Sequence, residues 1–241
     1  MNHALTSPDR SGRLFTLANM ITLGSLAASL TAVMQAFDHH FAWVGPLFLL
    51  AAICDGLDGF VARKRHTAGP LGMQLDSLVD MVSFGVVPPL VAYAYLKDCG
   101  TDLPFWMIGT YVACTAIRLV RFNLQTDKSF FNGLNSPSAA SLVVFLVWSL
   151  DTAFGSHAAQ PYGVMLEATL LFAAVMMVSP FRYVSTKKLK PTRRLGNQAA
   201  ALAIAALILG TAPYSLWVCA ALYAVSGPIA ALMQAFRRTP S

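Results

Sequence analysis

Charged residues are scarce in this 241-residue chain. Asp, Glu, Lys and Arg together make up 12% of the sequence and hydrophobic residues 56%, and the mean hydropathy is +0.58. The wetted surface of a soluble domain normally requires about 25% charged residues. The composition therefore excludes an ordinary soluble protein and indicates a chain that lies in a membrane.

Cysteine is also sparse, and its spacing fits neither a metal site nor a redox pair. The cysteines Cys54, Cys99, Cys114 and Cys219 each stand alone in apolar sequence. A zinc site or a redox motif would need closely spaced cysteines or histidine partners. We interpret all four as packing residues.

Long apolar segments predict an all-α, polytopic membrane helix bundle with about eight spans, because one span needs about 20 mostly apolar residues. Residues 1–13 are polar and form an expected cytoplasmic tail, and the apolar segment after them is long enough to stay as a span instead of being removed as a signal peptide. The expected spans are Leu14–Phe37, Phe41–Val61, Leu75–Leu96, Leu103–Leu124, Ser136–Phe154, Tyr162–Tyr183, the short Gln198–Leu209, and Tyr214–Phe236.

The basic residues are distributed very unevenly between the two faces of this topology. An even number of spans places both termini on one face, and every Lys and Arg except Lys97 then falls on that face. Basic residues concentrate on the cytoplasmic side of membrane proteins, so we expect this face to be cytoplasmic. We interpret the cluster Lys187 to Arg194 as a topology signal that also contacts anionic lipid head groups. No nucleic-acid partner is expected, because no aromatic residues are interleaved with the charge.

Four aspartates cluster where the second expected span ends and the third begins. Asp55 and Asp58 are spaced i, i+3, and Asp76 and Asp80 are spaced i, i+4, so each pair lies on one face of its helix. Ionisable residues in membrane helices are costly and usually mark function. The short connection Lys64 to Leu71 makes the two helices antiparallel neighbours, which brings the two acidic faces together at the cytoplasmic end.

Four carboxylates this close together would repel one another strongly unless cations lay between them. Hard oxygen ligands select Mg²⁺ or Mn²⁺ over zinc. Two such ions could clamp a diphosphate during an in-line displacement. We therefore expect two divalent cations, Mg²⁺ or Mn²⁺, as cofactors.

Small residues accompany the aspartates. Gly59, Ala62 and Gly72 remove side-chain bulk where a nucleotide would approach the helix backbone, and Arg63 can pair with phosphate or a carboxylate. Small residues also allow tight helix packing in membranes. For a single glycine the packing role is the better interpretation, whereas the combined pattern favours a binding site.

The spacing D-x-x-D-G-x-x-A-R-x8-G-x-x-x-D-x-x-x-D, from Asp55 to Asp80, resembles the signature of the CDP-alcohol phosphotransferase family. The resemblance covers about residues 14 to 190. It implies that Asp55, Asp58, Asp76 and Asp80 hold two metal ions and that Asp80 also acts as the base. It further implies that the CDP-lipid contacts are Gly59, Ala62, Arg63 and Gly72, together with Asn19 and Thr22 of an N-x-x-T element in the first span.

The residues after the third aspartate resemble the branch of the family that uses L-serine. Ser77 and Met81 stand where glycerol-phosphate-using relatives more often have Pro and Lys, and Ser83-Phe84-Gly85 follows. This resemblance implies transfer of the phosphatidyl group from CDP-diacylglycerol to the serine hydroxyl, giving phosphatidylserine and CMP. The same chemistry with glycerol 3-phosphate or inositol is the alternative. An ion-coupled transporter is a remote one, because the aspartates lie at one membrane face instead of near the midplane.

Two later stretches resemble the same branch. The first is Arg118-Leu119-Val120-Arg121-Phe122-Asn123. The second has two parts, Phe131-Asn132-Gly133-Leu134 and Ser136-Pro137-Ser138-Ala139-Ala140. Arg118 and Arg121, with Asn123 nearby, could bind the carboxylate of serine or a lipid phosphate. The alternative is a pair of interfacial arginines that anchor their helix.

Two positions depart from the family pattern. Gly69 replaces a Ser or Thr that contacts the CDP-lipid in relatives, a contact that Thr67 could supply, and Asn135 replaces a Pro. We expect residues 14–190 to form the catalytic membrane domain and residues 191–241 to add two helices and a basic tail. The resemblance also implies a homodimer, and the compact chain suits a bacterial inner membrane with the active site facing the cytoplasm.

Overall fold

The computed structural model describes residues 16–65, 69–124, 131–155, 162–183 and 211–238. Within them the chain is helical apart from turns and one pair of two-residue strands, β1 (Phe131–Asn132) and β2 (Arg182–Tyr183), so the expected all-α class is confirmed. The helices are α1 (Leu17–Phe37), α2 (Phe41–Lys64), α3 (Pro70–Asp80), the π-helical segment η2 (Met81–Val86), α4 (Val87–Asp98), α5 (Phe105–Leu124), α6 (Ser136–Phe154), α7 (Gly163–Val178) and α9 (Tyr214–Arg238).

Six helices in the described residues are long and apolar enough to cross a membrane. One of them is continuous from Pro70 to Asp98 and contains α3, η2 and α4. It begins before the expected Leu75, because Pro70 lies in the first turn, where its missing N–H is not needed. Helix α7 is shorter than expected and ends before Pro180, as the residue before a proline disfavours helical geometry. The expected span Gln198–Leu209 lies outside the described residues.

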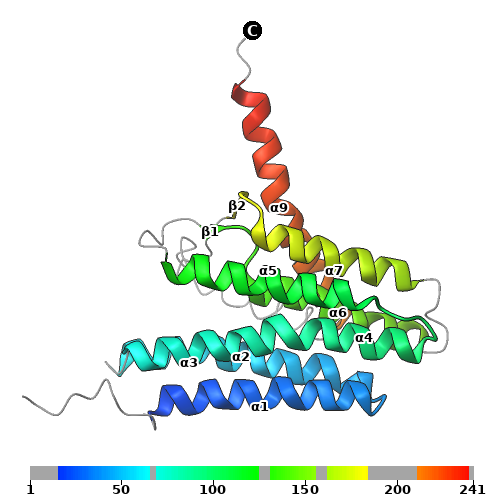
Figure 1. Cartoon of the computed structure of the whole chain (residues 1–241), viewed down its shortest axis with the longest axis horizontal. Coiled ribbons are helices and arrows are strands. Elements are labelled where there is room, and N and C mark those ends of the chain that lie inside the picture. The colour runs from blue at the N-terminus through cyan, green and yellow to red at the C-terminus, as the bar shows by residue number, and fades with distance from the viewer. Residues whose placement is uncertain (1–15, 66–68, 125–130, 156–161, 184–210, 239–241) are drawn as a thin grey trace, which may run out of the picture.

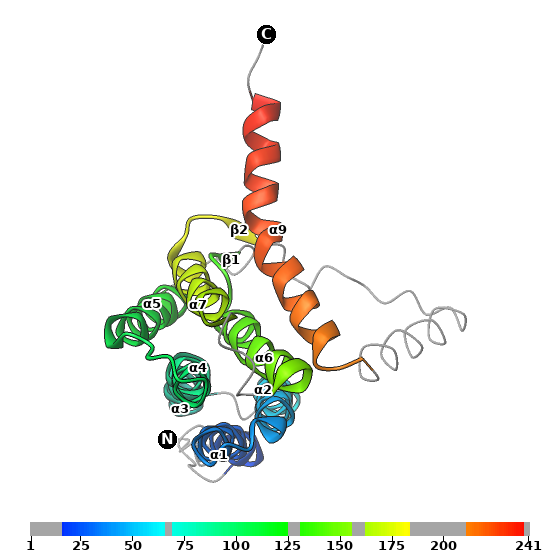
Figure 2. The same cartoon turned by 90° about the vertical axis from the view of Figure 1, so that its right-hand side faces the viewer.

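Helices α1 to α7 run side by side as a bundle (Figure 1), and α6 lies among α2, α7 and α9 in the view along the bundle (Figure 2). Eleven of the 19 residues of α6 are buried, which makes it the central helix. In the core, the ring of Phe48 on α2 meets Phe84 and Phe145 edge-on, at centroid distances of 5.9 and 5.8 Å. Such aromatic pairs add to the packing of the bundle.

Helix α9 has a different direction from the bundle helices. Its first residues lie against α6, and its C-terminal end projects away from the bundle (Figures 1 and 2). The expected helix at Tyr214–Phe236 is thus present, and its residues 214–231 have the length and composition of a span. The sequence carried no prediction of its direction, which only the structure shows.

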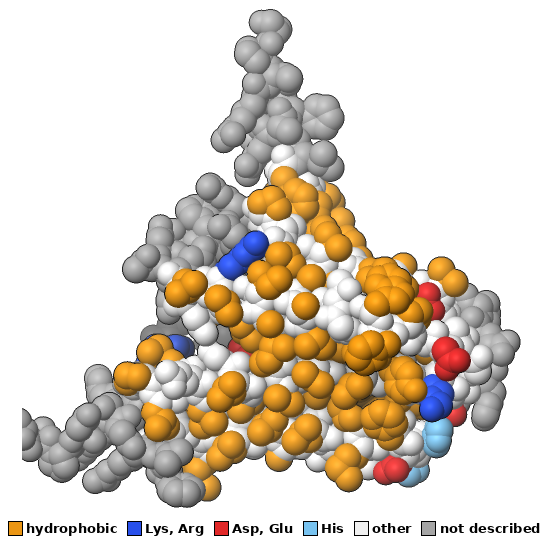
Figure 3. Space-filling model, viewed as in Figure 1, with side chains coloured by type: hydrophobic (Ala, Val, Ile, Leu, Met, Phe, Trp, Pro, Cys, Tyr) orange, Lys and Arg blue, Asp and Glu red, His pale blue; other side chains and the backbone are white. Residues whose placement is uncertain are grey.

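The surface of the bundle is apolar along most of its length. Hydrophobic side chains cover the middle of the face in Figure 3, and acidic, lysine and histidine side chains gather at one end of it. Large exposed side chains such as Met34, Trp43, Leu78 and Phe105 belong to this apolar surface. An exposed apolar surface of this extent belongs in lipid, so the protein is an integral membrane protein.

The π-helical segment η2 has a cause in the sequence. Pro88 and Pro89 follow it in the first turn of α4, and neither has an N–H to donate to Phe84 or Gly85 four residues earlier. A proline ring would also clash with those carbonyls in a regular α-helix. The chain widens instead, and the N–H of Val87 donates to the carbonyl of Val82, five residues back.

Candidate active site

Three of the four signature aspartates meet where α2 faces α3. One carboxylate oxygen from each of Asp55, Asp76 and Asp80 lies within 4.8 Å of the others, and all three residues are half-buried. Asp76 and Asp80 are four residues apart and therefore share one face of α3. We call these three residues the acidic trio.

The acidic trio offers hydrogen-bond acceptors close to one another. Within the described residues, Oδ1 of Asp80 is buried and has no hydrogen-bond partner. An ionised carboxylate cannot donate, and buried like charges require a compensating cation. Because hard oxygen ligands suit Mg²⁺ and Mn²⁺, the residues present fit a divalent cation.

Asp58 lies outside the acidic trio. It is buried on α2, and its Oδ2 accepts a hydrogen bond of 2.5 Å from the Thr22 hydroxyl of α1. It remains close enough to Asp76 for the two charges to interact. The structure thus brings Thr22 of the expected nucleotide element to an expected metal ligand, and the metal-binding role of Asp58 stays a prediction.

The signature glycines lie at close approaches. A Cβ atom at Gly72 would be 3.3 Å from Oδ1 of Asn19, and one at Gly59 would be 3.3 Å from the Arg63 guanidinium. Gly72 therefore lets the first turn of α3 lie against α1, which supports the packing role as well as a binding role. The other expected nucleotide contacts are the half-buried Ala62, Gly69 directly before α3, and Thr67, which lies outside the described residues.

Arg118 is built into the fold. Its side chain is 8% exposed, its Nε donates to the carbonyl of Leu134 at 2.6 Å, and its Nη1 donates to Oγ of Ser136 at 2.7 Å. It also lies close enough to Asp80 for their charges to interact. The guanidinium of Arg118 therefore fixes the segment before α6 next to the acidic trio, and this contact was not expected from the sequence.

The segment that Arg118 holds includes Gly133, a position where a larger side chain does not fit. Gly133 has φ +83°, and a Cβ there would collide with the carbonyl of Met177 on α7. Backbone N–H groups of Gly133 and Leu134 donate to Phe181 and Met176 at 2.8 and 2.9 Å. Asn135, which replaces the proline of relatives, caps α6 by accepting a bond of 3.0 Å from the N–H of Ser138. The glycine-containing stretch is thus a tight backbone connection beside the site.

Arg121 and Asn123 are exposed and point elsewhere. Arg121 donates to the carbonyl of Val178 at 2.8 Å, whereas the amide of Asn123 donates to the Ser77 hydroxyl of α3 at 3.0 Å. The structure therefore does not gather Arg118, Arg121 and Asn123 into one pocket. Their expected role in binding serine or a lipid phosphate remains a prediction.

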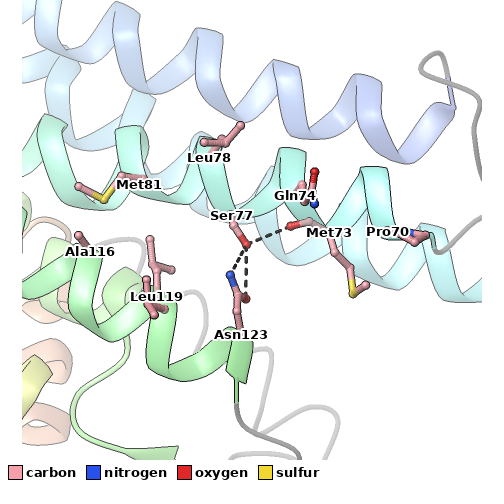
Figure 4. Close-up of a pocket in the computed structure, with 10 residues that line it drawn as sticks. Pro70, Met73, Gln74, Ser77, Leu78, Met81, Ala116, Leu119 and Asn123 are labelled. Atoms are coloured by element: carbon pink, nitrogen blue, oxygen red, sulfur yellow. Dashed lines mark hydrogen bonds between the residues drawn. The ribbon is translucent and has the colours of Figure 1, made fainter.

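A groove of about 620 Å³ runs between α3 and α5 (Figure 4). The Ser77–Asn123 hydrogen bond crosses it, and most of its other lining residues are apolar. They are Pro70, Met73, Gln74, Leu78, Met81, Ala116, Leu119 and Val120. Ser77 lines the groove and its neighbour Asp76 does not, so α3 carries two residues of the acidic trio and also forms one wall of the groove.

Comparison with known proteins shows the family to which the chain belongs. Residues 15–179 match the model of the family described as CDP-alcohol phosphatidyltransferase. A relative from Helicobacter pylori named CDP-diacylglycerol--serine O-phosphatidyltransferase is 34% identical over 180 residues, 73% of this chain and 75% of its own length. One of the same name from Mycobacterium tuberculosis is 33% identical over 243 residues, 93% of this chain and 81% of its own length.

A further relative of the same name, from Methanocaldococcus jannaschii, is 34% identical over 132 residues, which are 55% of this chain and 60% of that protein. The match to the family model covers more than half of the chain and includes the whole acidic trio. The chain therefore belongs to the CDP-alcohol phosphatidyltransferase family, as its signature predicted.

The two bonds of Arg118 predict a stability difference between two arginine variants. Arg118→Lys has a single terminal nitrogen and leaves Leu134 or Ser136 without its donor, so we expect a loss of about 1–3 kcal/mol. Arg121→Lys, at an exposed site with one bond, should cost less than about 1 kcal/mol. Thermal unfolding of the detergent-purified variants measures both. Equal losses would contradict the anchoring role of Arg118.

Proposed function

We propose that this protein transfers the phosphatidyl group of CDP-diacylglycerol to the hydroxyl of L-serine, giving phosphatidylserine and CMP. The observation that carries the proposal is the acidic trio on α2 and α3, together with the apolar groove of which α3 forms one wall. Such a trio suits the diphosphate of a CDP-lipid through cations, and an apolar surface suits the lipid. The names of the relatives support serine as the acceptor.

Two divalent cations, Mg²⁺ or Mn²⁺, are the proposed cofactors. Asp55, Asp76 and Asp80 would hold them, with Asp58 one helical turn along α2 from Asp55. When bound, such ions neutralise a diphosphate and stabilise the charge that develops on the leaving CMP. The buried and unpartnered Oδ1 of Asp80 supports this assignment.

Asp80 is the proposed base. It takes the proton of the serine hydroxyl while the serine oxygen attacks the phosphorus that carries diacylglycerol. The new bond joins serine to that phosphorus, and the bond from the phosphorus to CMP breaks in line with it. An aspartate is a weak base for an alcohol, so the proton moves together with the attack and not before it.

Arg121 and Asn123, which are exposed on α5 and bond to different partners, are proposed as separate contacts for the serine carboxylate or a lipid phosphate. Arg118 contributes through the segment it anchors and through its charge near Asp80. We propose residues 14–190 as the catalytic domain and residues 191–241 as an addition to it.

The proposed location is a bacterial inner membrane, with the acidic trio facing the cytoplasm. Arg63, Lys64 and Arg65 are exposed at the same end of the bundle as the trio, and basic residues favour the cytoplasmic side. We also propose a homodimer. The resemblance of the Asp55–Asp80 signature to the family, which implies a homodimer, supports this.

Acceptor specificity tests the reaction. We expect the purified protein to release CMP from CDP-diacylglycerol only with Mn²⁺ or Mg²⁺ and L-serine, and to form phosphatidylserine in equal amount. Glycerol 3-phosphate, inositol and no acceptor serve as comparisons. CMP release with glycerol 3-phosphate or inositol would support the proposed type of reaction but overturn the assignment of serine as the acceptor. If no acceptor gave metal-dependent release, the assignment of the protein as this enzyme would be overturned.

The same assay tests Asp80 as the base, with a variant at Asp151 as the control. Asp80→Asn should lower turnover by about 10²-fold or more, because the variant loses the proposed base and a cation ligand. Asp151→Asn removes a half-buried carboxylate near the opposite end of the bundle and should leave turnover unchanged. Near-normal turnover by Asp80→Asn would remove the base assignment.

Membrane orientation is tested with vesicles. Inverted inner-membrane vesicles should release CMP into the medium without detergent, since their outer surface is the cytoplasmic one. Right-side-out vesicles should do so only after detergent is added. The reverse pattern would overturn the proposed orientation.

The dimer is tested by mass in lipid nanodiscs. We expect the wild-type protein to have the mass of two chains. A wild-type protein with the mass of one chain would rule out the dimer.

A further inference from the structure

The segment η2 follows Asp80 directly and connects it to three other helices. Its consecutive residues Ser83, Phe84 and Gly85 are all buried. Each of them meets a different neighbour: Ser83 meets α1, Phe84 meets α2 and Gly85 meets α5. π-Helical segments are rare and occur frequently at functional sites.

Ser83 makes the polar contact among the three contacts of η2. Its Oγ lies 2.7 Å from Oγ of Ser29, and both side chains are completely buried. Ser29 is also within 3.0 Å of the carbonyls of Ser25 and Leu26 on its own helix. Either hydroxyl can donate the bond between the two serines; when Ser29 donates to a carbonyl of its own helix, Ser83 donates to Ser29.

Phe84 and Gly85 make the apolar contacts. The Phe84 ring meets Phe48 edge-on, and a Cβ atom at Gly85 would lie 3.0 Å from Cγ2 of Thr115. The close approach at Gly85 leaves little freedom for η2 to shift toward α5. Three contacts in three directions therefore fix both the rotation and the depth of this segment.

Helix α3, which carries Asp76 and Asp80, buries few side chains of its own, and its Ser77–Asn123 bond to α5 is exposed. Val79 is its one buried residue, whereas α4 has eight. Met73 and Leu78 are 63% and 67% exposed. The rotation of α3 about its axis therefore depends on the helix that follows it.

We propose that Ser83 is a positioning residue for the acidic trio: its hydrogen bond to Ser29 at η2 sets the rotation of α3, and hence the distance of Asp76 and Asp80 from Asp55. Pro88 and Pro89 already prevent regular helix at η2, and the bond from Ser83 to Ser29 adds the polar contact that ties η2, and with it the end of α3, to α1. The proposal rests on the proposed function only in that the trio binds a divalent cation.

Mn²⁺ binding by the full-length purified protein tests this, measured by electron paramagnetic resonance without lipid substrate. Ser83→Ala should weaken Mn²⁺ affinity by about tenfold or more, as loss of a group that orients metal ligands does. Ser29→Ala removes the same bond from the other side and should have a similar effect. The double variant should be no worse than either single variant, because one bond is lost in all three.

Ser25→Ala is the matched control. Ser25 is completely buried on α1, and its hydroxyl donates to the carbonyl of Ala51 on α2 at 2.8 Å. This variant loses a comparable interhelical bond without touching η2, so it should lower the melting temperature and keep wild-type Mn²⁺ affinity. Equal weakening by Ser25→Ala would indicate general loosening and overturn the proposal.

Two further outcomes separate the positioning role from the proposed function. Wild-type Mn²⁺ affinity in both Ser83→Ala and Ser29→Ala would overturn the positioning role and leave the reaction untouched. A wild-type protein that binds Mn²⁺ but releases no CMP would overturn the reaction, while the affinities of the variants still decide the role of Ser83.

Discussion

Repulsion among carboxylates is the constraint on which the rest of this structure depends. Two unit charges 4 Å apart interact by about 4 kcal/mol at an effective dielectric constant near 20, and the oxygens of Asp55, Asp76 and Asp80 lie within 4.8 Å of one another. Flexible loops would let such groups separate. Placing them on α2 and α3 prevents this, since each helix holds its aspartates at a spacing set by its own hydrogen bonds.

Irregular backbone near the trio is held by buried polar contacts. The prolines after η2 prevent regular helix, and Ser83 then bonds to Ser29 across the bundle. At the turn of Gly133 the backbone N–H groups of Gly133 and Leu134 donate to Phe181 and Met176, and Arg118 supplies donors to the Leu134 carbonyl and the Ser136 hydroxyl. In lipid, backbone that leaves helical geometry has to find its partners within the protein. Both irregular segments satisfy this requirement and lie next to Asp80.

The sequence predicted the helical class, most of the spans and the meeting of Asp55 with Asp76 and Asp80, because hydropathy and helical spacing are local properties. It did not predict the separate position of Asp58, since the Thr22 hydroxyl that binds it comes from another helix. The π-helical segment had a visible signal in Pro88-Pro89, which the apolar pattern of the span concealed. The direction of α9 depends on its packing against α6, to which its own residues give no guide.

Arg118 shows why a motif position does not by itself reveal a role. The sequence suggested a substrate ligand, whereas two of its donors serve the backbone connection before α6. Its charge still acts on Asp80. Four ionised carboxylates, with Asp58 counted beside the trio, and one guanidinium leave three negative charges uncompensated, which is more than one divalent cation balances. A substrate diphosphate would add negative charge to the same place, and this is the physical reason for proposing two cations.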